Sequence, residues 1–207
     1  MTTKKRKPKA VVVDCDDILY DFVPYLCFLY NKINATHLSA SDVKEWEFEN
    51  IKIKSADGSV ATGEGLRAVM NRFEDHGLYT LAPLVKDAKI ALEIIKSFGY
   101  KIIILTARPE RFGEQTYHYF LAKDISYDEL IFSWDKVAVI NKLSAKYDIE
   151  LFIDDKYKTV EAVNKYCKVK HTCIATMAHN EDIEEDEGIT RVNNLFECVR
   201  YLRNLND

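Results

Sequence analysis

The chain has 207 residues, which is enough for one substantial hydrophobic core and a small accessory unit. Its 47% hydrophobic and 30% charged residues are typical of a soluble globular protein, and no apolar run is long enough to span a bilayer. The formal net charge of -4 argues against binding of duplex nucleic acid, which requires a broad basic face.

The cysteines and the first residues of the chain bear on where the protein works. The five cysteines are odd in number and lack CxxC spacing, so neither a disulfide framework nor a zinc site is indicated. Residues 1–8 are basic and lead into only a short apolar run, so we expect a flexible basic tail and not a signal peptide. We therefore expect a cytoplasmic protein with reduced thiols and no membrane partner, and a homodimer stays open.

Short apolar runs separated by helical patterns predict an α/β fold with a parallel sheet. The runs are continuous and do not alternate with polar residues, as expected for strands that helices cover on both faces. Amphipathic helices are predicted between and after them, over residues 84–99, 133–148 and 193–204. The predicted strands are 9–14, 101–107, 150–155 and 171–176, with 128–133 as a further candidate.

Residues 22–83 interrupt this alternation of strands and helices. They begin with an aromatic-rich helical pattern and continue into polar and glycine-containing segments. We interpret them as a small, mainly helical cap inserted after the first strand. Residues 9–21 and 84–207 would then form the core, with the cap placed as a lid over one end.

Three predicted strands end in polar residues. Asp14 and Asp16 follow the first, Thr106 ends the second, and Asp154 and Asp155 end the third. In open α/β sheets, ligands bind beyond the carboxyl ends of the strands. Clustered carboxylates repel one another unless a cation lies among them, and hard oxygen ligands next to a phosphate suit Mg²⁺. The pattern predicts a magnesium and phosphate site.

These residues, and Lys136 on the predicted helix 133–148, also have ordinary structural interpretations. Asp14 and Asp16 could cap a turn, Thr106 could be a buried strand residue, and Lys136 could be an exposed helix lysine. Their agreement in order and strand context favours a site over separate structural roles.

The motifs resemble those of the haloacid dehalogenase superfamily of phosphohydrolases. The matching segments are DCDDI (14–18) after a strand, ILTAR (104–108), a lysine on a following helix and FIDD (152–155). The resemblance implies a Rossmann-like core of the haloacid dehalogenase type that uses Mg²⁺.

A narrower similarity is to the 5'(3')-deoxyribonucleotidases, which remove phosphate from nucleoside monophosphates beneath a small helical cap. It is carried by DCDDILYDF, LVKDAKIALEIIKSFGYKIIILTARP, FIDDK and RVNNLFECV. That family usually has glycine where this chain has Asp17.

The resemblance assigns roles to the acidic residues. Asp14 would be the nucleophile that forms an aspartyl phosphate, and Asp16 would protonate the leaving oxygen and then deprotonate water. Mg²⁺ would be bound by an Asp14 oxygen, the Asp16 backbone carbonyl and one or both of Asp154 and Asp155. Asp155 is favoured as the direct ligand.

Phosphate binding would fall to the Thr106 hydroxyl, the Ala107 backbone N–H and the Lys136 ammonium. Lys142 lies on the same predicted helix as Lys136, although Lys136 fits the family position better. Arg108 could contact substrate phosphate or stabilise the loop that follows it.

In the cap, Trp46 and Phe48 could stack on a base or form the core of the cap itself. The function expected from these observations is Mg²⁺-dependent hydrolysis of nucleoside 5'-monophosphates, and the resemblance implies pyrimidine deoxynucleotides such as dTMP or dUMP. Alternatives are a phosphatase for another small phosphometabolite or polynucleotide 3'-phosphate, a phosphotransferase, and a non-hydrolytic nucleotide-binding regulatory protein.

Overall fold

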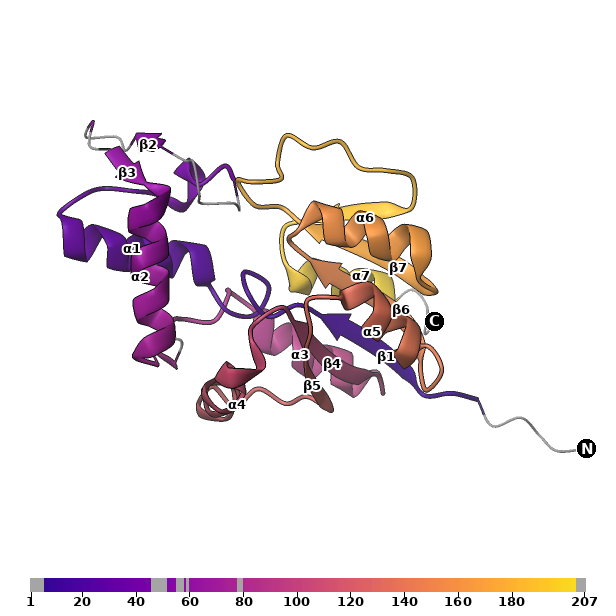
Figure 1. Ribbon diagram of the computed structural model, residues 1–207. Helices are drawn as coiled ribbons and strands as arrows, with labels where there is room; N and C mark the ends of the chain where they lie inside the picture. The colour runs from indigo at the N-terminus through magenta and orange to yellow at the C-terminus, as the bar shows by residue number, and fades with distance from the viewer. Residues whose placement is uncertain (1–5, 46–51, 55–57, 59, 78–79, 204–207) are drawn as a thin grey trace, which may run out of the picture.

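The computed structural model describes residues 6–45, 52–54, 58, 60–77 and 80–203. Its core is a six-stranded sheet in which every neighbouring pair of strands is parallel (Figure 1). The strands are β1 (Lys9–Val13), β4 (Lys101–Thr106), β5 (Glu129–Phe132), β6 (Asp148–Asp154), β7 (Val169–Ala175) and β8 (Ile189–Val192). Their order in the sheet is β5-β4-β1-β6-β7-β8.

Helices cover both faces of this sheet, as the continuous apolar runs predicted. They are α3 (Ala88–Ser97), α4 (Gly113–Ala122), α5 (Lys136–Leu143), α6 (Tyr157–Tyr166) and α7 (Leu195–Arg203), with a short 3-10 helix at Glu110–Phe112. Val11 and Val13 of β1 pack into the hydrophobic cluster that contains α3, α4 and α7. Ala10 and Val12 pack into the cluster that contains α5 and α6. Strand β1 is therefore buried on both sides.

The cap lies beyond the carboxyl end of β1 (Figure 1). Its helices α1 (Phe22–Asn34) and α2 (Gly63–Asp75) pack on each other, and a 3-10 helix spans Ala40–Asp42. A two-stranded antiparallel sheet, β2 (Lys52–Lys54) and β3 (Val60–Thr62), leads into α2. The Thr62 hydroxyl caps α2 by accepting a hydrogen bond from the Gly65 N–H at 3.1 Å.

Several elements were not predicted from the sequence. Strand β8 has only four residues and includes a charged arginine, so no apolar run marks it. Helices α2, α4 and α6 were not assigned from the sequence, and β2 and β3 are only three residues each. Among the described residues, no helix combines the length and apolar character needed to cross a bilayer.

The sheet order places β1 between β4 and β6. After β5 the chain returns past β1 to form β6 on its other side, so the direction of strand addition reverses at β1. Crevices at such reversal points are where open α/β sheets bind ligands. A ligand site is therefore expected at the carboxyl ends of β1, β4 and β6.

Candidate active site

The loop that follows β1 is compact and anchored in the core. The Asp14 N–H donates to the Ile153 carbonyl at 3.0 Å, which extends the pairing of β1 with β6 by one residue. The N–H groups of Leu19 and Tyr20 both donate to the Cys15 carbonyl at 2.9 Å, and both side chains are buried. The backbone around Asp14 and Asp16 is thus held at the rim of the sheet.

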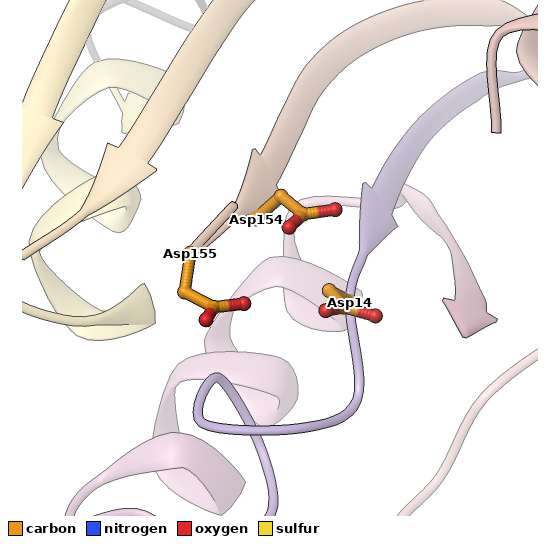
Figure 2. A group of neighbouring side chains, drawn as sticks. All are labelled: Asp14, Asp154 and Asp155. Atoms are coloured by element: carbon orange, nitrogen blue, oxygen red, sulfur yellow. The ribbon is translucent and has the colours of Figure 1, made fainter. Parts of the chain in front are cut away.

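Three carboxylates from β1 and β6 meet at this rim. Ligand atoms of Asp14, Asp154 and Asp155 all lie within 4.8 Å of one another, and all three residues are buried. Figure 2 shows their carboxylates turned toward a common space beyond the strand ends. The structure brings together the aspartates that the sequence analysis assigned to a metal.

A single buried lysine joins the cluster. Lys136 is the first residue of α5, and its Nζ lies 2.6 Å from Asp14 Oδ1 and 2.7 Å from Asp154 Oδ2. The Asp135 carboxylate fixes the start of this helix by accepting the Ala138 N–H at 2.9 Å. Lys142, by contrast, is exposed. Lys136 is therefore the lysine that the fold delivers to the site.

The cluster carries more negative than positive charge. Burial raises the pKa of Asp14, and the carboxylates of Asp154 and Asp155 raise it further, while Lys136 opposes them. Burial also raises the pKa of Asp155, with His179 acting in the opposite direction. Burial alone would lower the pKa of Lys136, but its two carboxylate neighbours outweigh burial and raise that pKa.

This donor set fits a divalent cation. Three buried carboxylates share one ammonium, which leaves an excess of negative charge among oxygen ligands only. Hard oxygen ligands and space for phosphate are what Mg²⁺ requires. Asp14, Asp154 and Asp155 are the side chains that would hold it.

Asp16 points to a different partner. Its carboxylate accepts from Arg108 Nη2 at 2.6 Å and from Arg108 Nε at 3.0 Å, a forked ion pair. The Arg108 guanidinium is buried, lies 4.4 Å from the centre of the Tyr20 ring and donates to Thr116 Oγ1 at 3.3 Å. Arg108 thus holds Asp16 and stabilises the loop that contains Tyr20, and it also lines the site cavity.

Thr106 and Ala107 connect the end of β4 to this arginine. Thr106 is fully buried, and its Oγ1 accepts the Arg108 N–H at 3.2 Å. Its carbonyl accepts the Ser133 N–H at 2.8 Å, which ties the end of β4 to the turn before α5. Ala107 lines the cavity next to Asp14 and Asp16.

Asp17 follows Asp16 in the loop after β1, and the fold buries it. Its φ of 56° is left-handed, a conformation that glycine adopts without strain, which accounts for glycine at this position in the similar family. The side chain is buried, and Oδ1 accepts the Val23 N–H at 2.9 Å, whereas Oδ2 has no hydrogen-bond partner among the described residues. Burial and the nearby Asp155 raise its pKa.

Asp155 is held in place by residues that were not predicted from the sequence. His179 Nε2 lies 3.1 Å from Asp155 Oδ2 and 3.1 Å from its backbone oxygen. The Asn180 amide donates to the carbonyls of Asp155, at 2.7 Å, and Ala175, at 2.8 Å. Arg191 of β8 in turn donates to Asn180 Oδ1 at 3.0 Å. His179 and Asn180 lie 24 and 25 residues from Asp155 in the sequence, so only the fold reveals this support.

The strand ends open into a cavity of about 320 Å³ that reaches the cap. The core contributes the aspartates, Lys136 and Arg108, together with Pro109, Trp134, Lys156 and Thr159, and the cap contributes Phe22, Arg67 and Met70. Trp46 and Phe48, which could stack on a base or form the core of the cap, lie outside the described residues.

Comparisons with known proteins agree with this architecture. No protein-family profile matches the chain. In sequence it is 27% identical over 185 residues to the Bacillus subtilis protein named "Putative nucleotidase YqfW", covering 88% of this chain and 86% of the relative. A Bacillus cereus protein named "Putative nucleotidase" is 28% identical over 165 residues, covering 75% of this chain and 83% of the relative.

Solved structures share the fold at low sequence identity. The L-2-haloacid dehalogenase of Xanthobacter autotrophicus superposes with a TM-score of 0.61 at 14% identity, covering 95% of this chain and 98% of that one. A protein of Haemophilus somnus described as a predicted phosphoglycolate phosphatase gives 0.61 at 16% identity, covering 94% and 98%. The chain therefore has the fold of the haloacid dehalogenase-like hydrolases, as the motifs predicted.

The similarity in sequence points to related proteins with a particular activity. Both Bacillus relatives carry the name of a nucleotidase, and their alignments span most of the chain. The chain is thus similar over most of its length to proteins named as nucleotidases, and it shares the fold of the haloacid dehalogenase-like hydrolases.

Proposed function

We propose that the protein is a Mg²⁺-dependent phosphomonoesterase that hydrolyses nucleoside 5'-monophosphates through an aspartyl phosphate on Asp14. One observation carries the proposal: the buried Asp14 carboxylate lies 2.6 Å from Lys136 Nζ, within an acidic cluster that opens into a cavity shared with the cap. The similarity to proteins named as nucleotidases supports the nucleotide part of the proposal.

Phosphate binding would use the cationic and hydrogen-bonding groups around Asp14. Lys136, Arg108 and the Ala107 backbone all line the cavity, and the Thr106 side chain ends the neighbouring strand. When bound among the three aspartates, Mg²⁺ would supply the positive charge that lets a phosphate dianion approach them. Lys136 would then stabilise charge on the transferring phosphoryl oxygens.

The reaction divides into two displacements at phosphorus. A carboxylate oxygen of Asp14 forms a bond to phosphorus, the bond to the nucleoside oxygen breaks, and Asp16 donates a proton to that leaving oxygen. Asp16 then accepts a proton from water as the water oxygen attacks the phosphoryl group. The bond to Asp14 breaks, which releases phosphate and restores the carboxylate.

The ion pair between Asp16 and Arg108 bears on this proton transfer. Arg108 binds the Asp16 carboxylate through both Nε and Nη2, at 3.0 and 2.6 Å. Proton donation by Asp16 requires its carboxyl group to leave this ion pair and face the leaving oxygen. A substrate phosphate at the cavity floor offers Arg108 another anionic partner, which would release Asp16 for this role.

The substrate proposed is a pyrimidine deoxynucleotide such as dTMP or dUMP, on the basis of the resemblance to the 5'(3')-deoxyribonucleotidases. Stacking of Trp46 and Phe48 on the base stays a prediction, as does a cytoplasmic location. Separation of dTMP from dUMP would need a pocket shaped for one methyl group, worth about 1 kcal/mol.

A substrate panel tests the proposal. We expect phosphate release from dTMP, dUMP, UMP and dGMP to exceed release from ribose 5-phosphate, and excess EDTA to stop all of it. Equal kcat/KM for nucleotides and ribose 5-phosphate would replace the nucleotidase with a general phosphatase. Undiminished turnover in EDTA would refute the metal dependence.

A further inference from the structure

The turn between β5 and α5 is fixed at both ends. The Ser133 N–H donates to the Thr106 carbonyl at 2.8 Å, and Ser133 Oγ accepts the Asp135 N–H at 3.2 Å. The Asp135 carboxylate caps α5 through the Ala138 N–H. The backbone of Trp134, between these two residues, therefore has a defined position.

The side chain of Trp134 is left uncovered on this fixed backbone. Its exposed fraction is 76%, the largest among the exposed large hydrophobic residues of the described chain. An indole has a large apolar face that can stack on a planar group, and Trp134 presents this face beside a cavity and not on an open surface.

The cavity shows what kind of ligand would cover it. Trp134 lines the same cavity as Asp14 and Lys136, and the apolar residues Phe22 and Met70 of the cap line it as well. Lys136 follows Trp134 by two residues, so their Cα atoms are at most about 7 Å apart. A ligand with its phosphate at Lys136 and a planar apolar group a short distance away would satisfy both parts of the cavity.

We propose that Trp134 determines specificity by stacking on the base of the bound nucleoside monophosphate. This inference rests on the proposed function and names the residue that recognises the planar part of the substrate. Stacking on one aromatic face tolerates any base, so Trp134 would favour nucleotides over base-free phosphates without choosing among bases.

Kinetics of Trp134→Ala test the inference. We expect kcat/KM for dTMP and UMP to fall by about tenfold to hundredfold, since one aromatic contact to a base contributes on this scale. Activity on ribose 5-phosphate should stay the same, and Trp134→Phe should retain most of the nucleotide activity. Tyr166→Ala is the matched control, because Tyr166 is also an exposed aromatic residue at 61% but does not line the cavity.

Binding without turnover supplies a second readout. In a Trp46→Phe, Asp14→Asn variant, Trp134 is the only tryptophan of the chain. We expect dTMP with Mg²⁺ to quench its fluorescence and ribose 5-phosphate to leave it unchanged. Equal responses to the two ligands would contradict stacking.

The outcomes separate the two proposals. A wild-type enzyme that shows no preference for nucleotides over ribose 5-phosphate would refute the proposed function itself. A clear preference in the wild type that Trp134→Ala retains in full would refute only the role of Trp134 and place base recognition in the cap.

Discussion

The strand-end cluster and the cap lining of the same cavity are built in different ways. In the cluster, each ionised group has a short-range partner: Asp14 pairs with Lys136 and Asp16 with Arg108. The cap contributes the apolar side chains of Phe22 and Met70, together with the Arg67 guanidinium. Under the proposed function, the groups at the sheet edge would act at phosphorus, while the cap and the turn before α5 would select the group that the phosphate carries.

Replacing the nucleophile should have the largest effect. We expect Asp14→Asn to abolish turnover, because the amide has nearly the same shape but is a poor nucleophile. Circular dichroism should show that the variant remains folded. Burial raises the pKa of Asp14, so burial disfavours its charged form, and the substitution removes that cost. Turnover near the wild-type level would exclude Asp14 from its assigned role and remove the contrast between cluster and cap.

The two lysines of α5 provide a matched pair. Lys136→Ala should lower kcat by about 10²–10³-fold, because it removes the ammonium at 2.6 Å from the nucleophile. Lys142→Ala should leave kcat unchanged, because Lys142 is exposed on the same helix. If both variants lose activity equally, the loss reflects damage to α5 and says nothing about phosphoryl transfer.

Loss of the histidine that holds Asp155 should weaken metal binding. His179→Ala removes the contacts at 3.1 Å to Asp155, and we expect affinity for Mg²⁺ to fall by about 10–100-fold in calorimetric titration. His118→Ala is the control, since His118 is exposed on α4. Unchanged affinity in His179→Ala would show that Asn180 alone suffices to fix the loop.

Asp14 and Asp155 should make the stability of the metal-free protein fall as pH rises, whereas aspartates whose pKa the fold lowers make stability rise with pH. The pKa of Asp14 and of Asp155 lies above the ordinary value of 3.8, so above that pH the folded protein keeps protons that the unfolded chain releases. Without metal, these groups make the free energy of unfolding fall as pH rises through the interval up to their raised pKa values.

Mg²⁺ needs these carboxylates ionised, so its binding releases protons and strengthens with pH. Thermal unfolding at a series of pH values from about 5 to 8, with and without Mg²⁺, should show a stabilisation that grows with pH. A stabilisation that shrinks toward high pH would contradict the assignment of the cluster as the metal site.

The cap should have the smallest effect on catalysis. Met70→Ala should raise KM for nucleotides by a few-fold, about the contribution expected from one partly buried apolar side chain. Asn71→Ala, on the exposed side of α2, should change nothing. A fall in kcat for ribose 5-phosphate in Met70→Ala would mean that the cap also positions the phosphate, which would weaken the division between cluster and cap.

The sequence predicted the cluster because its residues follow buried strands. Asp14, Thr106 and Asp154 each come at the end of an apolar run, and parallel strands bring such ends to one edge of the sheet. Lys136 could be assigned only with the help of the resemblance, and the structure shows the geometric reason, namely that α5 begins at the same edge.

Other parts of the site could not be predicted in this way. His179 lies in the loop between β7 and β8, which places it next to Asp155. The sequence of that loop is polar and shows no helical or strand periodicity. In the sequence, Asp17 looks like a residue of an exposed turn. Its backbone is left-handed, but its side chain is buried and accepts a hydrogen bond from the Val23 N–H. Trp134 lies in a turn and its side chain is exposed, so no periodic pattern of buried apolar residues marks it in the sequence.

Trapping of the covalent intermediate tests the central claim most directly. The enzyme would be mixed with a substrate nucleotide and Mg²⁺, quenched in acid during turnover, and reduced with borohydride, which converts an aspartyl phosphate to homoserine. Mass spectrometry of the peptide that contains residue 14 should then show homoserine at Asp14, and the same treatment without substrate should leave aspartate. Full turnover with unmodified Asp14, or with homoserine at Asp16 instead, would contradict the proposed mechanism.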